Sequence, residues 1–361
     1  MSSKNPRELF TPQMHEYDRV GVSWHPYIMF FQGKSYKSHV VNTDSNGFRF
    51  TTFNDKKFAS DSLSYVDEVS VVIGGSTAFG VGATSDSKTI SSILSQKTNI
   101  LHLNLGGRAF NSTQELLLFK WLTSKRLKIK DITIISGAND LYLSGVNANS
   151  FMPSQFFGMQ YEACMTEGTL SPKRKLLKRL FSKLASNDID WTKTDIKTVI
   201  TSSLMSLIDS NFNRTLAHHK NYSKSNISVQ SAISSLDSAL CFWSALSTFL
   251  GFRLTYVLQP FAGWDKKQYT LEEKALFTYL DASQGSGNIL SQMSDIENYF
   301  ELTQGVSRIC DYYKINYIDS NAILAGRAEA SYEWLYVDRV HLTDLGYEVL
   351  ANLVHHHTCS L

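Results

Sequence analysis

One serine in this sequence stands where its hydroxyl could act as a nucleophile. Ser76 follows the apolar run 71–73 and two glycines, Gly74 and Gly75. Three β-branched residues in a row predict the end of a buried strand, and glycines permit backbone angles that other residues reach only with strain. A sharp strand-to-helix turn there would expose the hydroxyl and aim the first amides of a helix at a developing anion. Taken by itself, the run also fits an ordinary loop.

A histidine and an aspartate near the C-terminus could activate that serine. A serine hydroxyl is a poor nucleophile at neutral pH and needs an adjacent base. His341 can serve, because imidazole exchanges protons near neutrality. Asp338, three residues earlier, can accept a hydrogen bond from the other ring nitrogen and fix the tautomer. An isolated Asp-x-x-His motif is more often part of a surface loop, but its combination with Ser76 favours nucleophilic catalysis.

The elements that must position these residues alternate between strand and helix. Ligands of parallel sheets bind at the carboxyl ends of the strands, and the first three predicted strands all end in loops with small and polar residues. Alternating apolar strands and helices predict a parallel sheet covered on both faces. The predicted strands are 68–73, 100–105, 131–136, 253–258 and 316–319, and the predicted helices are 88–96, a helix from 112, 229–250, 294–313 and 347–354.

Four short motifs resemble, in this order, the sequence blocks of the SGNH (GDSL-like) hydrolase superfamily, in its GGST-type subgroup. The resemblance covers 70–140 and 251–354. It implies an α/β fold, a three-layer sandwich with a central parallel sheet of the flavodoxin-like SGNH type. It also implies a serine esterase or acyltransferase with Ser76, His341 and Asp338 as the catalytic residues, needing no metal and no cofactor. The motifs are 74–77 (GGST), 104–106 (NLG), 137–140 (GAND) and 338–341 (DRVH).

The resemblance further implies an oxyanion hole, whose donors would be the Ser76 amide, the Ala109 amide and the Asn139 side chain. Two positions depart from the family pattern. Gly75 replaces the aspartate that usually precedes the nucleophile, and Ala109 stands where the second block usually has glycine. An alanine amide can still donate, provided that the residue does not need a positive φ. Asn139 could instead cap the next helix. The fallback donors are the amides of Gly106 and Gly107.

Four further polar residues lie near these motifs. Arg108, beside the oxyanion loop, could bind an anionic group of the substrate, and Gln259, at a strand end, could face the substrate. We expect Asp140 to hold a loop together and Asp344 to cap the last helix.

The chain outside the motifs is interpreted as two additions to one domain. Residues 1–69 form an N-terminal extension packed on the main domain of 70–361, and 141–230 form a helical insertion or lid. Within the insertion, 171–183 predicts a basic amphipathic helix that contains no acidic residue. Such a helix could contact an acyl carrier, an acidic cofactor tail or a membrane surface, but a solvated face of a lid is the simpler interpretation.

Composition limits the location and the partners. The 361 residues carry a net charge of +2, so no global field favours nucleic acid or a membrane, and no nucleic-acid partner is expected. No apolar run follows the basic residues at the start, and the most apolar stretch, 239–258, is interpreted as a buried helix followed by a strand rather than an integral membrane segment. Four widely spaced cysteines predict reduced thiols in a cytoplasmic protein without structural zinc.

The function expected from these features is removal of a short O-acyl group, acetyl first, from a carbohydrate or related small molecule through an acyl-enzyme. One alternative is an acyltransferase that moves an acyl group from coenzyme A or an acyl carrier protein to a sugar or natural-product acceptor. A second alternative is a non-catalytic carbohydrate-binding protein on the same fold, which would use the N-terminal aromatic residues.

Overall fold

The computed structural model describes residues 5–65, 68–123, 128–145, 156, 226–283, 287–327 and 332–359. The chain divides into two units, one of 1–156 with 226–361 and one of 157–225, and the description below concerns the first. The basic helix predicted at 171–183 lies outside the described residues, as does most of the predicted insertion 141–230. The division at 69 and the boundaries of the insertion therefore stay predictions.

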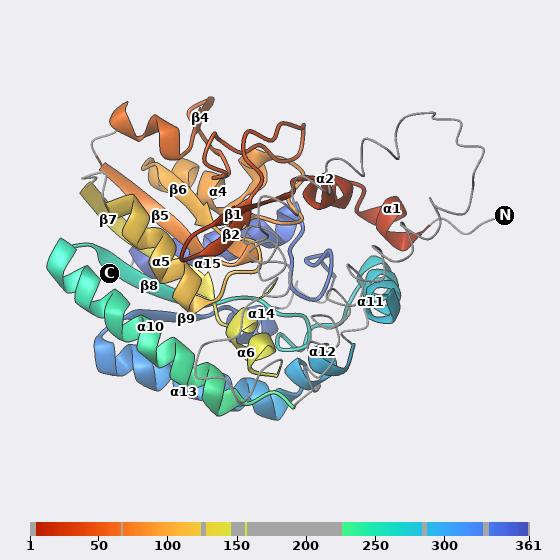
Figure 1. The fold of residues 1–361 in the computed structure, drawn as a ribbon. Coiled ribbons are helices and arrows are strands. Elements are labelled where there is room, and N and C mark those ends of the chain that lie inside the picture. The colour runs from red at the N-terminus through yellow and green to blue at the C-terminus, as the bar shows by residue number, and fades with distance from the viewer. Residues whose placement is uncertain are drawn as a thin grey trace, which may run out of the picture. The chain divides into compact units, whose positions relative to one another are not determined.

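A five-stranded parallel sheet forms the centre of the described unit (Figure 1). The chain leaves the first of its strands, β5, for a neighbour on one side, β6, and then crosses to β7 on the other side. In a sheet of this order, a crevice opens where the winding reverses, at the carboxyl end of the first strand. The strands lie in the order β6 (His102–Gly106), β5 (Glu68–Gly74), β7 (Lys128–Ser136), β8 (Arg253–Leu258) and β9 (Asn316–Asp319).

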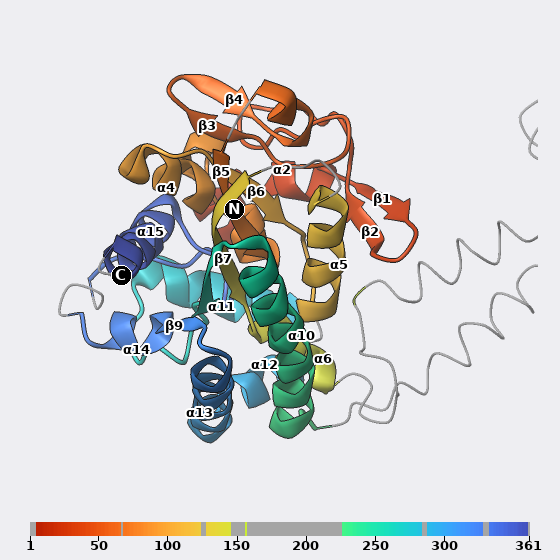
Figure 2. The ribbon, with the colours of Figure 1, turned by 90° about the vertical axis from the view of Figure 1, so that its left-hand side faces the viewer.

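Helices cover both faces of this sheet, so the predicted three-layer α/β sandwich is confirmed. Helices α5 (Ser112–Thr123) and α10 (Val229–Leu250) lie on one side, and α4 (Ile90–Thr98) and α15 (Asp344–Cys359) lie on the other (Figure 2). Helix α13 (Ile296–Tyr313) packs against α10, and α6 (Ala138–Ser144) also contacts α10. Further helices after β5 are α3 (Ser76–Phe79), α11 (Leu271–Ser283), α12 (Gly287–Met293) and α14 (Ser320–Ala325), and the 3₁₀ turns are η1 (Ser60–Tyr65) and η2 (Asp86–Lys88).

The register of the sheet places the carboxyl ends of its strands at one edge. Gly74 of β5 pairs with Gly106 of β6 and with Ile135 of β7. Leu258 of β8 pairs with Ser136 of β7. The loops that follow β5, β6 and β7 therefore begin side by side, and they carry the first three sequence motifs, 74–77, 104–106 and 137–140.

The N-terminal segment packs directly on the sheet domain. It contains α1 (Pro6–Phe10), α2 (Met14–Arg19) and two hairpins, β1 (Val22–His25) with β2 (Met29–Gln32) and β3 (Thr51–Phe53) with β4 (Lys56–Phe58). Gln32 Nε2 donates to the Gly106 carbonyl at 2.7 Å, and Thr51 Oγ1 donates to the His102 carbonyl at 2.9 Å. Both contacts end on β6, so the segment covers that edge of the sheet.

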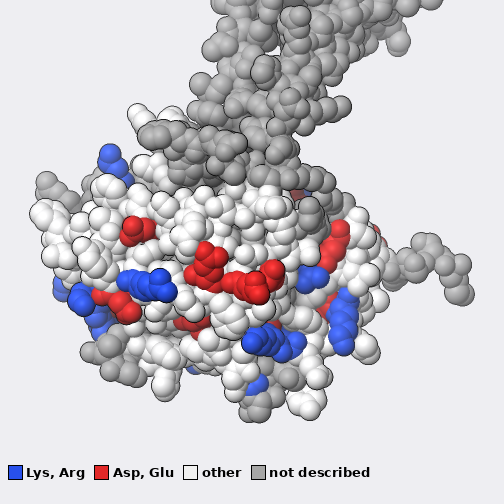
Figure 3. Space-filling view, turned by 90° about the horizontal axis from the view of Figure 1, so that it is seen from below, with Lys and Arg blue, Asp and Glu red and all other residues white. Residues whose placement is uncertain are grey.

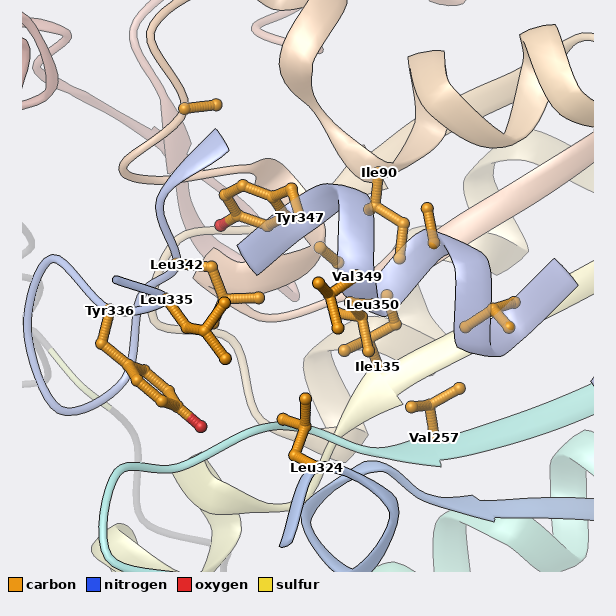
Figure 4. Packing of buried hydrophobic residues seen from close by; sticks show 14 of the residues in the cluster. Ile90, Ile135, Val257, Leu324, Leu335, Tyr336, Leu342, Tyr347, Val349 and Leu350 are labelled. Carbon is orange, nitrogen blue, oxygen red and sulfur yellow. The ribbon is translucent and has the colours of Figure 1, made fainter. Parts of the chain in front are cut away.

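A buried cluster fixes the loop that carries the Asp-x-x-His motif. Leu335, Tyr336 and Leu342, each 1% exposed or less, bracket the motif in sequence. They pack with residues of α15 above Ile135 of β7 and Val257 of β8 (Figure 4). Full burial of one such side chain contributes about 1.5–3 kcal/mol. The motif is therefore held from both ends by the main core.

Helix α10 is, within the described part of the chain, the one helix long and apolar enough to cross a membrane by length and composition, with a mean hydropathy of 1.2. It ends at Leu250, is followed by Gly251 at φ +76°, and gives way to β8 at Arg253, as the sequence predicts. Its Trp243 side chain is buried, and the helix contacts α5, α6 and α13.

On the face drawn in Figure 3, basic and acidic side chains lie interspersed.

Candidate active site

Ser76 is the first residue of a short helix that begins immediately after the central strand. β5 ends at Gly74, where a φ of +150° and the closeness of the Ile135 carbonyl oxygen, which any Cβ would strike, both require glycine. Gly75 precedes the helix in an extended conformation, and Gly80 ends it at φ +92°. The predicted strand-to-helix turn is present and leaves Ser76 partly exposed at a helix N-terminus.

The structure brings Ser76, His341 and Asp338 into one hydrogen-bonded chain. His341 Nε2 lies 2.7 Å from Ser76 Oγ, and His341 Nδ1 lies 2.7 Å from Asp338 Oδ2. The other oxygen of Asp338 accepts the amides of Val340 and His341, both at 2.8 Å. These carboxylate contacts orient the imidazole and place its Nε2 where it can accept the serine hydroxyl proton.

The electrostatics of Asp338 suit this role. Burial alone would raise the pKa of Asp338, but the charge of His341 and hydrogen bonds from His341 and the Val340 amide outweigh burial and lower it. The carboxylate is thus anionic at neutral pH and accepts Nδ1–H. With the proton on Nδ1, Nε2 of the neutral ring carries the lone pair that a general base needs.

Asn139 and Ala109 lie on the two loops that flank Ser76. Asn139 Nδ2 donates to the Phe110 carbonyl at 2.7 Å, and a Cβ at position 75 would lie only 2.8 Å from the same nitrogen. Glycine at 75, where the family pattern has aspartate, therefore gives Asn139 room beside the nucleophile turn. One amide hydrogen of Asn139 fixes the side chain, and the other remains available to an oxyanion.

Contrary to the condition expected from the sequence, Ala109 has a positive φ of +61°, in the left-handed conformation that glycine favours. Alanine tolerates this conformation at a cost of about 1–2 kcal/mol, so the amide keeps the orientation that a glycine would give it. In the described part of the chain, neither the Ala109 amide nor the Ser76 amide has a protein acceptor. Both are free to donate to an oxyanion, as is required of an oxyanion hole.

The amides of Gly106 and Gly107, expected as fallback donors, are already hydrogen-bonded within the protein. The Gly107 amide donates to the Gly74 carbonyl at 2.9 Å, and the Gly106 amide donates to Asn104 Oδ1 at 3.0 Å. These bonds fix the loop after β6 against the end of β5. Because the two amides already have internal acceptors, they do not serve as oxyanion donors.

Two predicted substrate contacts are also corrected. The Arg108 guanidinium donates from Nη1 to the Tyr17 carbonyl at 2.7 Å and from Nη2 to the Gly21 carbonyl, so it anchors the N-terminal segment instead of facing the substrate. Gln259 is 1% exposed, its backbone amide donates to the Ser136 carbonyl at 3.1 Å, and its side-chain Nε2 lies 3.5 Å from Thr77 Oγ1. A side chain buried to that extent packs beneath the site and does not contact substrate in this conformation.

Replacing Arg108 by alanine should therefore reduce stability and leave substrate affinity unchanged. Hydrogen bonds to charged groups contribute about 1.5–3 kcal/mol, so we expect a loss of unfolding free energy of about that size in urea titrations. KM for a neutral ester should stay within about twofold, because no substrate group meets the guanidinium. A variant with unchanged stability and a raised KM for anionic esters would instead support a substrate contact.

Of the two other acids, Asp140 has the expected role and Asp344 does not. Asp140 accepts hydrogen bonds from Ser112, in keeping with the predicted loop-holding role. Asp344 does not cap its own helix, because it accepts the Thr84 amide at 2.8 Å, whereas Thr343 Oγ1 accepts the Gly346 amide at 3.1 Å. Among the described residues, no group of three or more His, Cys, Asp or Glu side chains is arranged to hold a metal ion.

Comparisons with known proteins find similarity in structure only. No protein-family model and no curated protein sequence matches the chain. The structure is similar to a lipase/acylhydrolase from Enterococcus faecalis, with 12% identity and a TM-score of 0.40 over 79% of this chain and 93% of that chain. It is also similar to the acetyl xylan esterase AlAXEase, with 9% identity and a TM-score of 0.38 over 80% and 98%. A third similar structure is an extracellular lipase from Streptomyces rimosus, with 13% identity and a TM-score of 0.39 over 81% of this chain and 100% of that chain. Similarity at this level assigns no activity, so the chemistry is derived from the side chains themselves.

Proposed function

We propose that this chain is an SGNH-type serine esterase that removes a short O-acyl group, acetyl first, from a carbohydrate or related small molecule. The observation that carries the proposal is the chain of two 2.7 Å contacts from Ser76 Oγ through His341 to Asp338. A nucleophile, a base and an orienting carboxylate in this arrangement form the machinery of acyl transfer on several unrelated folds.

In the proposed mechanism, Ser76 Oγ attacks the ester carbonyl carbon while its proton passes to His341 Nε2. The carbonyl oxygen becomes an oxyanion that accepts hydrogen bonds from the Ser76 and Ala109 amides and from Asn139. Collapse of this intermediate breaks the bond to the leaving alkoxide, which takes the proton from His341, and an acyl-enzyme remains on Ser76. Water then attacks the acyl carbon with His341 as the base, and the carboxylic acid leaves.

The preference for a short acyl group on a carbohydrate follows from the resemblance to the SGNH superfamily, whose members act on acetylated sugars, lipids, thioesters and natural-product intermediates. We further propose a cytoplasmic enzyme with a small-molecule substrate. Acyl transfer from coenzyme A or a carrier protein uses the same Ser76 chemistry with a different acceptor. The basic run at 171–183 favours that alternative, because it would complement an acidic donor. A purely carbohydrate-binding role has no need of the Ser76, His341 and Asp338 arrangement.

The test is hydrolysis of p-nitrophenyl acetate, butyrate and octanoate by the wild type and by Ser76→Ala. We expect serine-dependent release that is fastest for acetate, and then serine-dependent deacetylation of acetylated sugars. Preference for octanoate would point to lipids and contradict the short-acyl proposal. If added sugar acceptor suppresses hydrolysis and an acylated sugar appears, the enzyme is a transferase. No serine-dependent turnover and no acyl group on Ser76 by mass spectrometry would rule out both forms of acyl chemistry.

A further inference from the structure

Two buried acids lie in the first turns of α5 and α6, the helices that begin at the two loops of the candidate oxyanion hole, and the proposed mechanism uses neither. Asp140 is 7% exposed and follows Asn139 in the first turn of α6. Glu115 is 1% exposed and lies in the first turn of α5. Buried carboxyl groups are costly unless they are hydrogen-bonded or protonated, so their contacts indicate what they do.

Asp140 supplies hydrogen-bond acceptors to the beginning of a different helix. Its carboxylate accepts the Ser112 amide, at 3.3 and 3.2 Å from the two oxygens, and Ser112 Oγ at 2.7 Å. The first amides of a helix have no partner within the helix. Asn111 and Gln114 bond to each other's amides at the start of α5, and Asp140 provides for Ser112 from α6. The two helices are thus joined at their N-termini by one carboxylate.

This junction lies next to both flanking oxyanion donors. Asn139 reaches from α6 to the Phe110 carbonyl, and Asp140 reaches from α6 to Ser112. Phe110 directly follows Ala109, whose amide is the backbone donor on that loop. Two neighbouring residues of one helix therefore hold the loop at Phe110 and at Ser112, immediately after Ala109, and so set the distance between the Ala109 amide and the Asn139 side chain.

We propose that the ionised carboxylate of Asp140 is a positioning group that holds the two flanking donors of the oxyanion hole at the spacing an acyl-transfer intermediate requires. The proposal rests on the proposed function and assigns Asp140 no contact with the substrate. Charge-assisted hydrogen bonds are shorter and about twice as strong as neutral ones. Protonation of Asp140 should therefore loosen the junction and slow the chemistry without unfolding the chain.

The surroundings of Asp140 let it carry this charge only above mildly acidic pH. Burial raises the pKa of Asp140 to about 6, although hydrogen bonds from Ser112 oppose the rise. Burial, and next the charge of Asp140, raise the pKa of Glu115 well above its usual range, and Glu115 accepts a hydrogen bond from Ser136 Oγ at 2.7 Å. Tyr256 faces the pair, and its buried hydroxyl has no hydrogen-bond partner among the described residues. Burial raises the pKa of Tyr256 and of its neighbours Cys310 and Tyr317, which favours the neutral form of each group.

The experiment measures how fast a fluorophosphonate labels Ser76 between about pH 4.5 and 8. In this reaction the Ser76 Oγ–P bond forms, the P–F bond breaks, the serine proton goes to His341 and fluoride leaves, while the phosphoryl oxygen occupies the oxyanion hole. His341 and Asp140 must both be unprotonated. The logarithm of the wild-type rate constant should therefore fall with a slope approaching two below about pH 6.

Asp140→Asn should label about 10- to 100-fold more slowly at pH 8, because the donors are misplaced, and its acid limb should have a slope of one. Ser112→Ala should move the second proton step to higher pH, because the Ser112 hydroxyl lowers the pKa of Asp140. Glu115→Gln is the matched control: its carboxyl group bonds to Ser136 and not to Ser112 or Phe110, so the slope of two should persist and the rate should remain within about twofold of the wild type. Thermal melts would verify that each variant is folded.

A wild-type slope of one throughout would overturn the inference, as would a slope of two in Asp140→Asn or loss of the second step in Glu115→Gln. In each of these cases Ser76 is still labelled, so the proposed function stands. Absence of labelling in the folded wild type at every pH would instead overturn the proposed function and, with it, this inference.

Discussion

Replacement of Ser76 by alanine is expected to lower kcat for ester hydrolysis by about four to six orders of magnitude, because the variant has no atom to carry the acyl group. The residual rate would come from the oxyanion donors acting on a bound ester with water as the nucleophile. The measurement is kcat at saturating substrate, with labelling by the fluorophosphonate lost in the same variant. Ser87→Ala, at a partly exposed serine outside the 2.7 Å contact chain, is the control and should keep wild-type kcat.

Substitutions of His341 and Asp338, the two residues hydrogen-bonded in series with Ser76, should also lower kcat by several orders of magnitude. His341→Ala is expected to lose about as much activity as Ser76→Ala, and the double variant no more than either alone, since the residues act as a unit. Asp338→Asn should lose about 10⁴-fold, because an amide in its place favours the wrong tautomer of His341. Additive losses in the double variant, or an active Ser76→Ala enzyme, would contradict the acyl-enzyme mechanism.

The core strands and the nucleophile were predictable because their signals are local. The ranges predicted for β8, β9 and α10 agree with the structure, and β8 and α10 are largely apolar runs that end at turn residues. Ser76, His341 and Asp338 could be grouped from residue type and order of motifs although Ser76 and His341 lie 265 positions apart. The parallel register then brings the strand ends to one edge, which accounts for the convergence of the first three motifs, and His341 joins them through Ser76.

Side-chain direction and long-range contacts were not predictable. Arg108 and Gln259 occupy the loops expected to meet a substrate, but one turns to the N-terminal segment and the other into the core. The four-residue helix α3 is too short to show a periodicity. Ala109 was recognised as a departure from glycine, but only the backbone shows that alanine adopts the left-handed conformation there. The joint between Asp140 and Ser112 also depends on the packing of two helices and has no sequence signature.

The second large effect is expected at Arg49, in the N-terminal segment. Its side chain is fully buried and donates to the Gly80 carbonyl at 2.7 Å and to the Phe79 carbonyl at 3.2 Å. It also pairs with Asp86 at 3.2 Å. Breaking a buried ion pair by removing one partner costs about 3–5 kcal/mol. Arg49→Met should therefore lower the unfolding free energy by about that amount in urea titrations at pH 7.

The same aspartate provides a matched control. Lys57 Nζ lies 3.1 Å from Asp86 Oδ2, but the lysine side chain is 52% exposed. Solvent screens such a pair, so Lys57→Met should cost at most about 1 kcal/mol. Equal losses in the two variants would show that Asp86 needs only a nearby charge. A loss below about 1 kcal/mol in Arg49→Met would contradict the structural role of the guanidinium.

The consequence for activity follows from where Arg49 donates. Phe79 and Gly80 are at the C-terminal end of α3, whose first residue is Ser76. A cation at a helix C-terminus satisfies carbonyls that the helix cannot pair and complements its dipole. Arg49→Lys keeps the charge but presents a single ammonium where the guanidinium fork meets several acceptors. We therefore expect its stability to lie between wild type and Arg49→Met, and its Ser76 labelling rate to fall with it. A lysine variant with restored stability but slow labelling would separate the fold-supporting role of Arg49 from its support of the nucleophile turn.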